Sequence, residues 1–155
     1  MSTWQPIVSA TDFSAPSRHA AQRAAMLARQ TGASMTLLHT VGGSALDDLR
    51  RWLADDSAAA GVIEADARRR LQDLATELGR QREITVRTHL AIGHPVEQIV
   101  RHADEVHAGL LVTGTRGAGF LRGVVVGSTA ERVAKRTSRP VLMVRTACSA
   151  CRKRR

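Results

Sequence analysis

Two short glycine-containing segments have the composition of a phosphate-binding loop. The first is Gly114-Thr115-Arg116-Gly117, and the second, Gly127-Ser128, follows after nine intervening residues. Glycines let the main chain turn sharply and, lacking side chains, let backbone N–H groups approach an anion. The spacing is neither a Walker loop, which requires Gly-Lys-Ser/Thr, nor the Gly-x-Gly-x-x-Gly dinucleotide pattern in its usual first turn. Taken alone, a plain connection between a strand and a helix is the commoner interpretation of such glycines.

The second segment adds a helix start to this loop. Ser128-Thr129-Ala130-Glu131 has the capping-box pattern and predicts that the last helix begins here. The unpaired N–H groups and the dipole of a helix start favour a bound phosphate. The Ser128 hydroxyl could donate to a phosphate oxygen or cap its own helix, and Arg116 and Arg122 could add charge-assisted hydrogen bonds.

The elements that must position this loop alternate between short β-rich runs and longer helical ones. Strands are predicted at residues 7–10, 35–41, 84–90, 110–113 and 141–144, with helices at about 14–32, 62–78 and 93–106 and from 128 onward. This βαβαβαβαβ order predicts an α/β fold, a five-stranded parallel sheet with helices on both faces. Ligands in such sheets bind beyond the carboxyl ends of the strands, where the strand order reverses.

The composition is that of a globular protein without membrane segments, and it does not identify a ligand or partner. The chain has 155 residues, 43% of them hydrophobic, which suits one globular domain, assigned to 1–147, with a basic tail over 148–155. No apolar run approaches the roughly 20 residues of a membrane helix, and no secretory signal opens the sequence, so we expect a cytoplasmic protein without membrane contact. The net charge of +9 attracts nucleotides, nucleic acids and anionic lipid alike, so it selects no partner.

Metal and cysteine chemistry have weak support in the sequence. Cys148 and Cys151 form a lone Cys-x-x-Cys, which is half of a four-ligand zinc site and lies in the basic tail. The six histidines do not pair at metal-ligand spacing, and packing is the expected role of His39 and His89 in their strands. No carboxylate partner is evident for His102 or His107. We therefore predict no protein-bound metal and no catalytic residue.

Combined with the first strand, the glycine spacing resembles a known pattern. Gly114-x2-Gly117-x9-Gly127-Ser128 matches the nucleotide-binding motif of the universal stress protein family, in the branch that binds ATP. The segment 7–14, with Asp12, looks like the opening strand and acidic residue of that family. Gly93-His94-Pro95 resembles its Gly-x-Pro helix entry, and 139–144 resembles its closing strand. The resemblance extends over about 6–145 and implies a Rossmann-like sheet of the adenine nucleotide alpha hydrolase-like type, with strand order 3-2-1-4-5.

The resemblance also implies where a ligand binds. Asp12, with Ala10 and Thr11 at the same strand end, would contact the nucleoside, and main-chain groups of Val41 would hold the adenine. Thr113 and Gly114 would lie along the ribose and first phosphate, while the remaining phosphates would contact Arg116, Gly117, Gly127, Ser128 and Thr129. The implied cofactor is ATP, or ADP or AMP, together with Mg²⁺. Arg116 stands where many relatives have His, and Thr129 where an aliphatic residue is common.

Three functions remain open from the sequence. The resemblance favours a regulatory or signalling module of the stress response, forming a homodimer through the last strand, Val141–Val144, and acting on an unidentified protein partner, with at most slow ATP hydrolysis. An adenylate-forming or ATP-hydrolysing enzyme is the second, although such enzymes usually carry Ser-Gly-Gly-x-Asp-Ser where this chain has Asp12-Phe13-Ser14-Ala15. The third is a nucleic-acid binder, which the scarcity of aromatic residues and the lack of a reading motif disfavour, so no specific nucleic acid is expected.

Overall fold

The computed structural model describes residues 5–42, 57–115 and 127–146, and these form one parallel β-sheet with helices packed on it. The strands are β1 (Ile7–Ala10), β2 (Met35–Val41), β3 (Val86–Ile92), β4 (Leu110–Gly114) and β5 (Val141–Val144). They lie in the order β3-β2-β1-β4-β5, and every neighbouring pair is parallel. The predicted α/β fold and its 3-2-1-4-5 strand order are confirmed.

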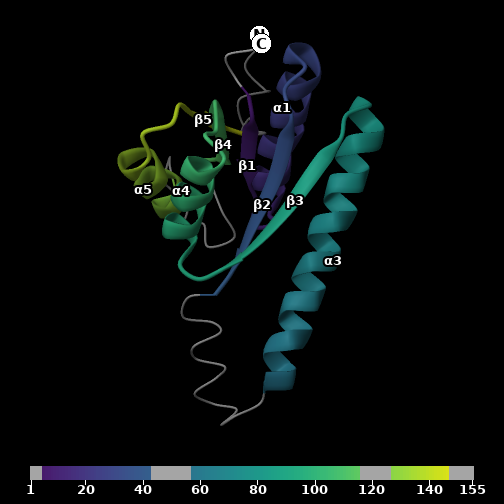
Figure 1. Cartoon of the computed structure of the whole chain (residues 1–155), viewed down its shortest axis with the longest axis vertical. Helices are drawn as coiled ribbons and strands as arrows, with labels where there is room; N and C mark the ends of the chain where they lie inside the picture. Colours follow the sequence, from purple (N-terminus) through teal and green to yellow (C-terminus); the bar gives the residue numbers. More distant parts are fainter. Residues whose placement is uncertain (1–4, 43–56, 116–126, 147–155) are drawn as a thin grey trace, which may run out of the picture.

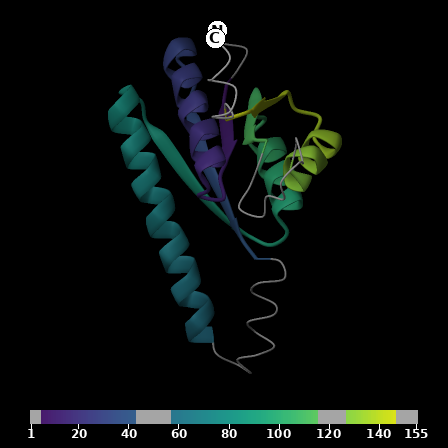
Figure 2. The same ribbon diagram turned by 180° about the vertical axis from the view of Figure 1, so that it is seen from behind.

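Helices cover both faces of the sheet (Figure 1). They are α1 (Ala15–Thr31), α3 (Ser57–Arg82), α4 (Pro95–Glu105) and α5 (Ser128–Arg136). The view from behind in Figure 2 shows α1 and α3 on one face, and α4 and α5 lie on the other. Among the described residues, no helix is both long and apolar enough to cross a bilayer.

Small side chains let α1 pack closely on the central strands. Ser14 is its N-cap, with a hydroxyl that accepts from the backbone N–H of Ser17, and Pro16 occupies the first turn. Its buried residues are mostly alanines, at positions 20, 21, 24, 25 and 28. Gly32 ends the helix with a left-handed φ of 67° and donates its N–H to the carbonyl of Ala28.

The third strand begins two residues later than predicted. The pattern from Ile84 to Leu90 favours a strand, but α3 runs on to Arg82 and Glu83 adopts a left-handed φ of 55°. The N–H of Ile84 then donates to the carbonyl of Gly79 at 3.2 Å, which closes the helix end. Because that donor is used by the cap, strand pairing starts only at Val86, opposite Met35.

The register of the sheet separates two apolar layers. Ile7 and Val112 point to the α1 and α3 side, whereas Val8 and Leu111 point to the α4 and α5 side. In both views α3 extends past the carboxyl ends of the strands, so it flanks the edge where a ligand is expected (Figures 1 and 2).

Candidate functional site

The sheet has its switch point between β1 and β4. Ser9 pairs with Val112 across these strands, and α1 follows β1 on one face while α5 follows β4 on the other. In parallel sheets, connections that diverge in this way form a crevice at the carboxyl ends of the strands where ligands bind, and we refer to this candidate place as the crevice. Ala10 ends β1 and Gly114 ends β4, so the structure brings these two predicted site residues to neighbouring strand ends.

The start of α5 is tied to the end of β4. The N–H of Gly127 donates to the carbonyl of Thr115, and the N–H of Thr115 donates to Val144 at 3.1 Å. Gly127 is the N-cap, in an extended conformation and without a side-chain cap, and Ser128 and Thr129 are exposed in the first turn. The first N–H groups of α5 therefore lie beside the switch point with no side-chain acceptor at the cap, an arrangement suited to an anion.

The predicted capping box is wrong by one residue. Gly127, rather than Ser128, is the N-cap, and Glu131 N–H bonds back to the Gly127 carbonyl at 3.1 Å. Glu131 is then too far along the helix to reach back to the cap, and its carboxylate accepts from Lys135 Nζ at 2.6 Å. The hydrogen bond and the positive charge of Lys135 lower the pKa of Glu131.

Thr113 brings a buried hydroxyl to the crevice. Thr113 is 5% exposed, and among the described residues its Oγ1 has no hydrogen-bond partner. Strand alternation puts it on the same face as Leu111, towards α4 and α5. A buried hydroxyl without a partner is costly, so Thr113 Oγ1 is a candidate for a hydrogen bond with a ligand.

The loop after β1 is held by a network of hydroxyls. Thr11 is buried, with Oγ1 3.0 Å from Ser17 Oγ, and its Oγ1 accepts from Phe13 N at 3.1 Å. Asp12 is exposed and accepts from the N–H of Ser14 at 3.0 Å and from the Ser14 hydroxyl. Asp12 thus braces the cap residue of α1 without capping the helix itself.

Val41 and two glycines form the neighbouring strand ends. The Val41 side chain is buried against Ala67, and its carbonyl accepts from the N–H of Gly93 at 3.0 Å. Gly42 and Gly93 have φ of 128° and 133°, and a Cβ on Gly42 would lie 2.8 Å from Gly93 N. A base held by the main chain of Val41 would use the second lone pair of this oxygen, since the first is occupied.

His39, placed as a packing residue by the sequence, has a polar role. Its Nδ1 lies 2.7 Å from the carbonyl oxygen of Thr11, which can only accept, so Nδ1 carries the proton. Burial lowers the pKa of His39; the hydrogen bond to Thr11 and the charge of Asp12 oppose the shift, and Arg70 adds to it. The neutral ring ties β2 to the loop that carries Asp12.

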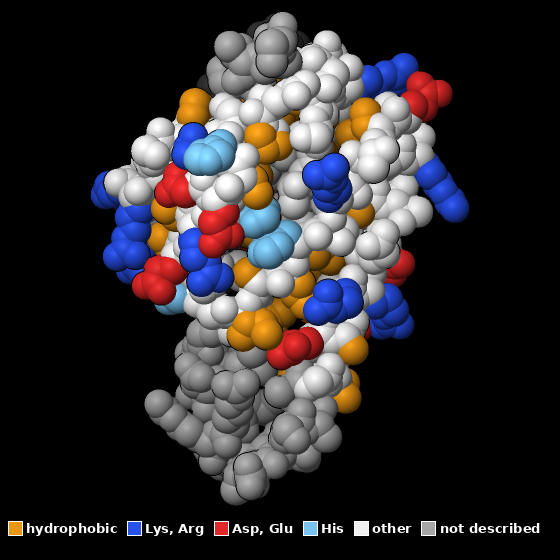
Figure 3. All heavy atoms as spheres, in the orientation of Figure 1, with side chains coloured by type: hydrophobic (Ala, Val, Ile, Leu, Met, Phe, Trp, Pro, Cys, Tyr) orange, Lys and Arg blue, Asp and Glu red, His pale blue; other side chains and the backbone are white. Residues whose placement is uncertain are grey.

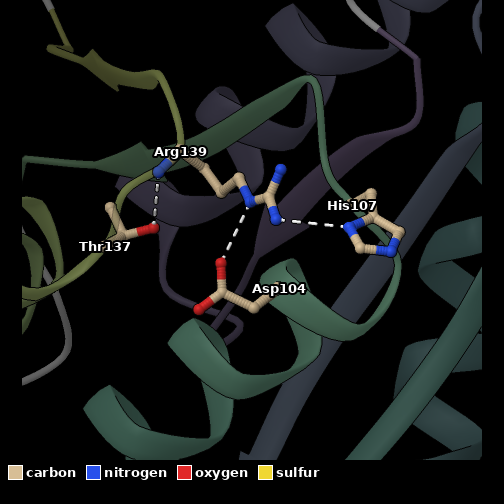
Figure 4. Close-up of polar contacts among 4 residues, drawn as sticks. All are labelled: Asp104, His107, Thr137 and Arg139. Carbon is tan, nitrogen blue, oxygen red and sulfur yellow. Dashed lines mark hydrogen bonds and ion pairs between the residues drawn. The ribbon is translucent and has the colours of Figure 1, made fainter.

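Two further polar clusters lie away from the crevice. The first lies at the amino ends of β4 and β5, on the far edge of the sheet from the crevice. There Arg139 Nε donates to Asp104 at 3.0 Å, and its NH2 group lies 3.3 Å from His107 Nδ1 (Figure 4). Asp104 thus joins His107 through Arg139, a link the sequence did not indicate.

The second cluster lies between α4 and β3. There the rings of His89 and His102 stack with centroids 4.0 Å apart, on the face where Figure 3 shows histidines gathered. Burial and the charge of His89 lower the pKa of His102.

Some predicted features cannot be placed. Arg116 and Gly117 of the loop, and Cys148 and Cys151 of the tail, lie outside the described residues. Within the described parts of the chain, no group of three or more His, Cys, Asp or Glu side chains could hold a metal ion.

A family model, a sequence relative and two solved structures match most of the chain, and all belong to one family. The sequence model of the universal stress protein family matches residues 3–145. A universal stress protein of Methanocaldococcus jannaschii is 30% identical over 144 residues, covering 92% of this chain and 82% of the relative. A universal stress protein solved in complex with cAMP has a TM-score of 0.71 at 26% identity, over 93% of this chain and 98% of that one. The universal stress protein of Archaeoglobus fulgidus in complex with dAMP has a TM-score of 0.65 at 26% identity, over 91% and 98%.

Proposed function

The chain belongs to the universal stress protein family, and on that premise we propose that it binds an adenine nucleotide, with ATP as the principal ligand, and acts as a regulatory module. The proposed site is the crevice at the switch point between β1 and β4. The observation that carries the proposal is the start of α5, tied through Gly127 to the end of β4 and lacking a side-chain cap. A helix start in this position offers several N–H donors and a favourable dipole to a phosphate.

The orientation of the ligand follows from the groups on each side. Exposed Ser128 and Thr129, with Gly114 and Gly127, would hold the phosphates, together with Arg116 and Gly117 of the loop. The Thr113 hydroxyl would gain its missing partner from the ribose or first phosphate. Ala10, Thr11, Asp12 and Val41 would form the nucleoside end. Two structural relatives carry cAMP and dAMP, both adenine mononucleotides, which supports an adenine ligand.

A regulatory role is favoured over fast catalysis by the placement of the carboxylates. Asp12 lies at the proposed nucleoside end, and Glu131 in α5 is paired with Lys135. Neither is positioned as a general base for water attacking a terminal phosphate. We therefore expect single-turnover hydrolysis of ATP to be slower than about one per second, the lower edge of ordinary enzyme rates.

The proposal includes assembly and location. Residues 1–147 would form the nucleotide-binding domain, followed by the basic tail at 148–155. β5 is an edge strand with Leu142 and Met143 each 36% exposed, and pairing with a second copy would cover them. Nucleotide occupancy would change the surface seen by a protein partner in the cytoplasm, where ATP and its products are available.

Mass spectrometry of ligand released from purified, denatured protein tests the proposal. We expect an adenine nucleotide, and calorimetry with ATP, ADP, AMP and cAMP to show saturable binding. Omitting Mg²⁺ should weaken binding of ATP more than that of AMP, because the triphosphate carries more charge for the ion to neutralise. If no nucleotide is released and none of the four nucleotides binds, the proposed nucleotide-binding function is refuted.

A further inference from the structure

Arg70 is an exposed side chain of α3 that borders the face of this helix packed on the sheet. That face is apolar and includes Ala67, Leu71, Leu74 and Leu78, all buried. Arg70 lies three residues after Ala67 and four before Leu74, so it stands next to this face. The neighbouring Arg69 pairs with Asp66 at 2.6 Å. Arg70 instead contacts an aromatic ring of the loop that follows β1.

A stack of rings fixes the position of this guanidinium. The Cζ of Arg70 lies 4.5 Å from the ring centroid of Phe13, and the Phe13 ring lies 4.3 Å from that of His39. His39 in turn donates to the carbonyl of Thr11. A guanidinium lying on an aromatic face keeps the N–H groups at its edge available for hydrogen bonds in its own plane.

The backbone of Phe13, whose ring is part of this stack, has an energetically unfavourable conformation. Phe13 has a φ of 64°, in the left-handed region that non-glycine residues rarely occupy. Such a conformation persists only where surrounding contacts hold it, and it is frequent at ligand sites. Here the Thr11 hydroxyl accepts from Phe13 N, so the same loop that presents Asp12 also presents the ring on which Arg70 lies.

We infer that Arg70 contacts the nucleoside end of the bound nucleotide and contributes to its recognition. This inference rests on the proposed function. The stack lies at the carboxyl ends of β1 and β2, beside Asp12, while the start of α5 follows β4. A guanidinium only donates hydrogen bonds, so its partners would be ribose oxygens or ring nitrogens of the purine. Phosphates, at the start of α5, would be bound independently of it.

Affinities of the full-length chain for ATP, AMP and adenosine test this inference. Calorimetry serves for the nucleotides, and competition against bound AMP serves for adenosine. Arg70→Gln should weaken all three by a similar factor, about tenfold for the loss of one charge-assisted hydrogen bond. Arg68→Gln is the matched control, since it removes the same charge from an exposed position on the same helix and should leave all three affinities unchanged. Arg70→Lys keeps the charge but lacks the planar fork, and we expect it to lose most of the affinity that Arg70→Gln loses.

Each outcome separates this inference from the proposed function. Equal affinities of the Arg70→Gln and Arg68→Gln variants, with the unmodified chain binding normally, would overturn the role of Arg70 and leave the nucleotide site intact. A loss that grows from adenosine to AMP to ATP would also overturn it, because that gradient identifies a phosphate contact. If the unmodified chain binds none of the three ligands, the proposed function itself fails. Should Arg70→Gln not fold, as judged by circular dichroism, the comparison of Arg70→Lys with Arg68→Gln decides.

Discussion

Replacing Thr113 by valine should stabilise the empty protein and weaken its nucleotide binding. Thr113 Oγ1 is buried and has no partner in the part of the chain that the structure describes, whereas valine has nearly the same shape without the hydroxyl. An unsatisfied buried hydroxyl costs about 1–3 kcal/mol, so Thr113→Val should raise the free energy of unfolding by about 1 kcal/mol. For a chain of this size that corresponds to a rise in Tm of about 2–4 °C. A hydrogen bond to the ligand contributes about 0.5–1.5 kcal/mol, so affinity should fall about twofold to tenfold.

The matched control is Ser9→Ala. Ser9 Oγ is also buried and has no partner within residues 5–42, 57–115 and 127–146, but strand alternation puts it on the opposite face with Ile7, under α1. Its replacement should stabilise the ligand-free protein without changing nucleotide affinity. Urea unfolding and calorimetry with ATP measure the two quantities. The assignment of this hydroxyl to the ligand would be refuted if Thr113→Val lowered the free energy of unfolding. It would also be refuted if the variant bound ATP with the same affinity as the unmodified chain.

Three other predictions concern the stability of the fold. Gly42→Ala should lower the free energy of unfolding by about 1–3 kcal/mol, because its φ is positive and a Cβ would contact the neighbouring backbone; Gly32→Ala, which has open space, should cost less in the same urea titration. Burial lowers the pKa of both His39 and His102, so between the lowered pKa and the ordinary histidine value of 6.5 these residues bind more protons in the unfolded chain than in the folded one. Stability should therefore fall as pH drops through this range, and His102→Gln should reduce the dependence. Arg139→Gln removes the ion pair to α4 at the far edge and should cost about 0.5–1 kcal/mol by thermal unfolding, with ATP affinity unchanged.

The sequence contains most of the information on the fold because local patterns and packing agree there. The bounds of β2 were predicted from a β-rich run between Gly32 and Gly42, and the structure has the same residues. The start of β3 was missed, since Ile84 has strand propensity but its N–H completes the end of α3. A backbone cap of this kind depends on the conformation of Glu83, which composition does not reveal.

The candidate site was predictable only where spacing along the chain determines it. The ends of β1 and β4 and the start of α5 follow from the order of strands and helices, so the sequence could place Asp12, Gly114 and Gly127 at these ends. The stack of Arg70 on Phe13 depends on tertiary packing between segments far apart in sequence. Its one signal was a charged residue beside the apolar face of a helix, which is commonly a solvated position.

A titration followed by nuclear magnetic resonance tests the location of the site most directly. With ¹⁵N-labelled protein and increasing AMP or ATP, the account predicts saturable shifts of the amide signals of Gly114, Gly127, Ser128 and Thr129, and little change at Asp104 on the far edge. Saturation without movement of the α5 amides, or shifts confined to the far edge, would contradict it.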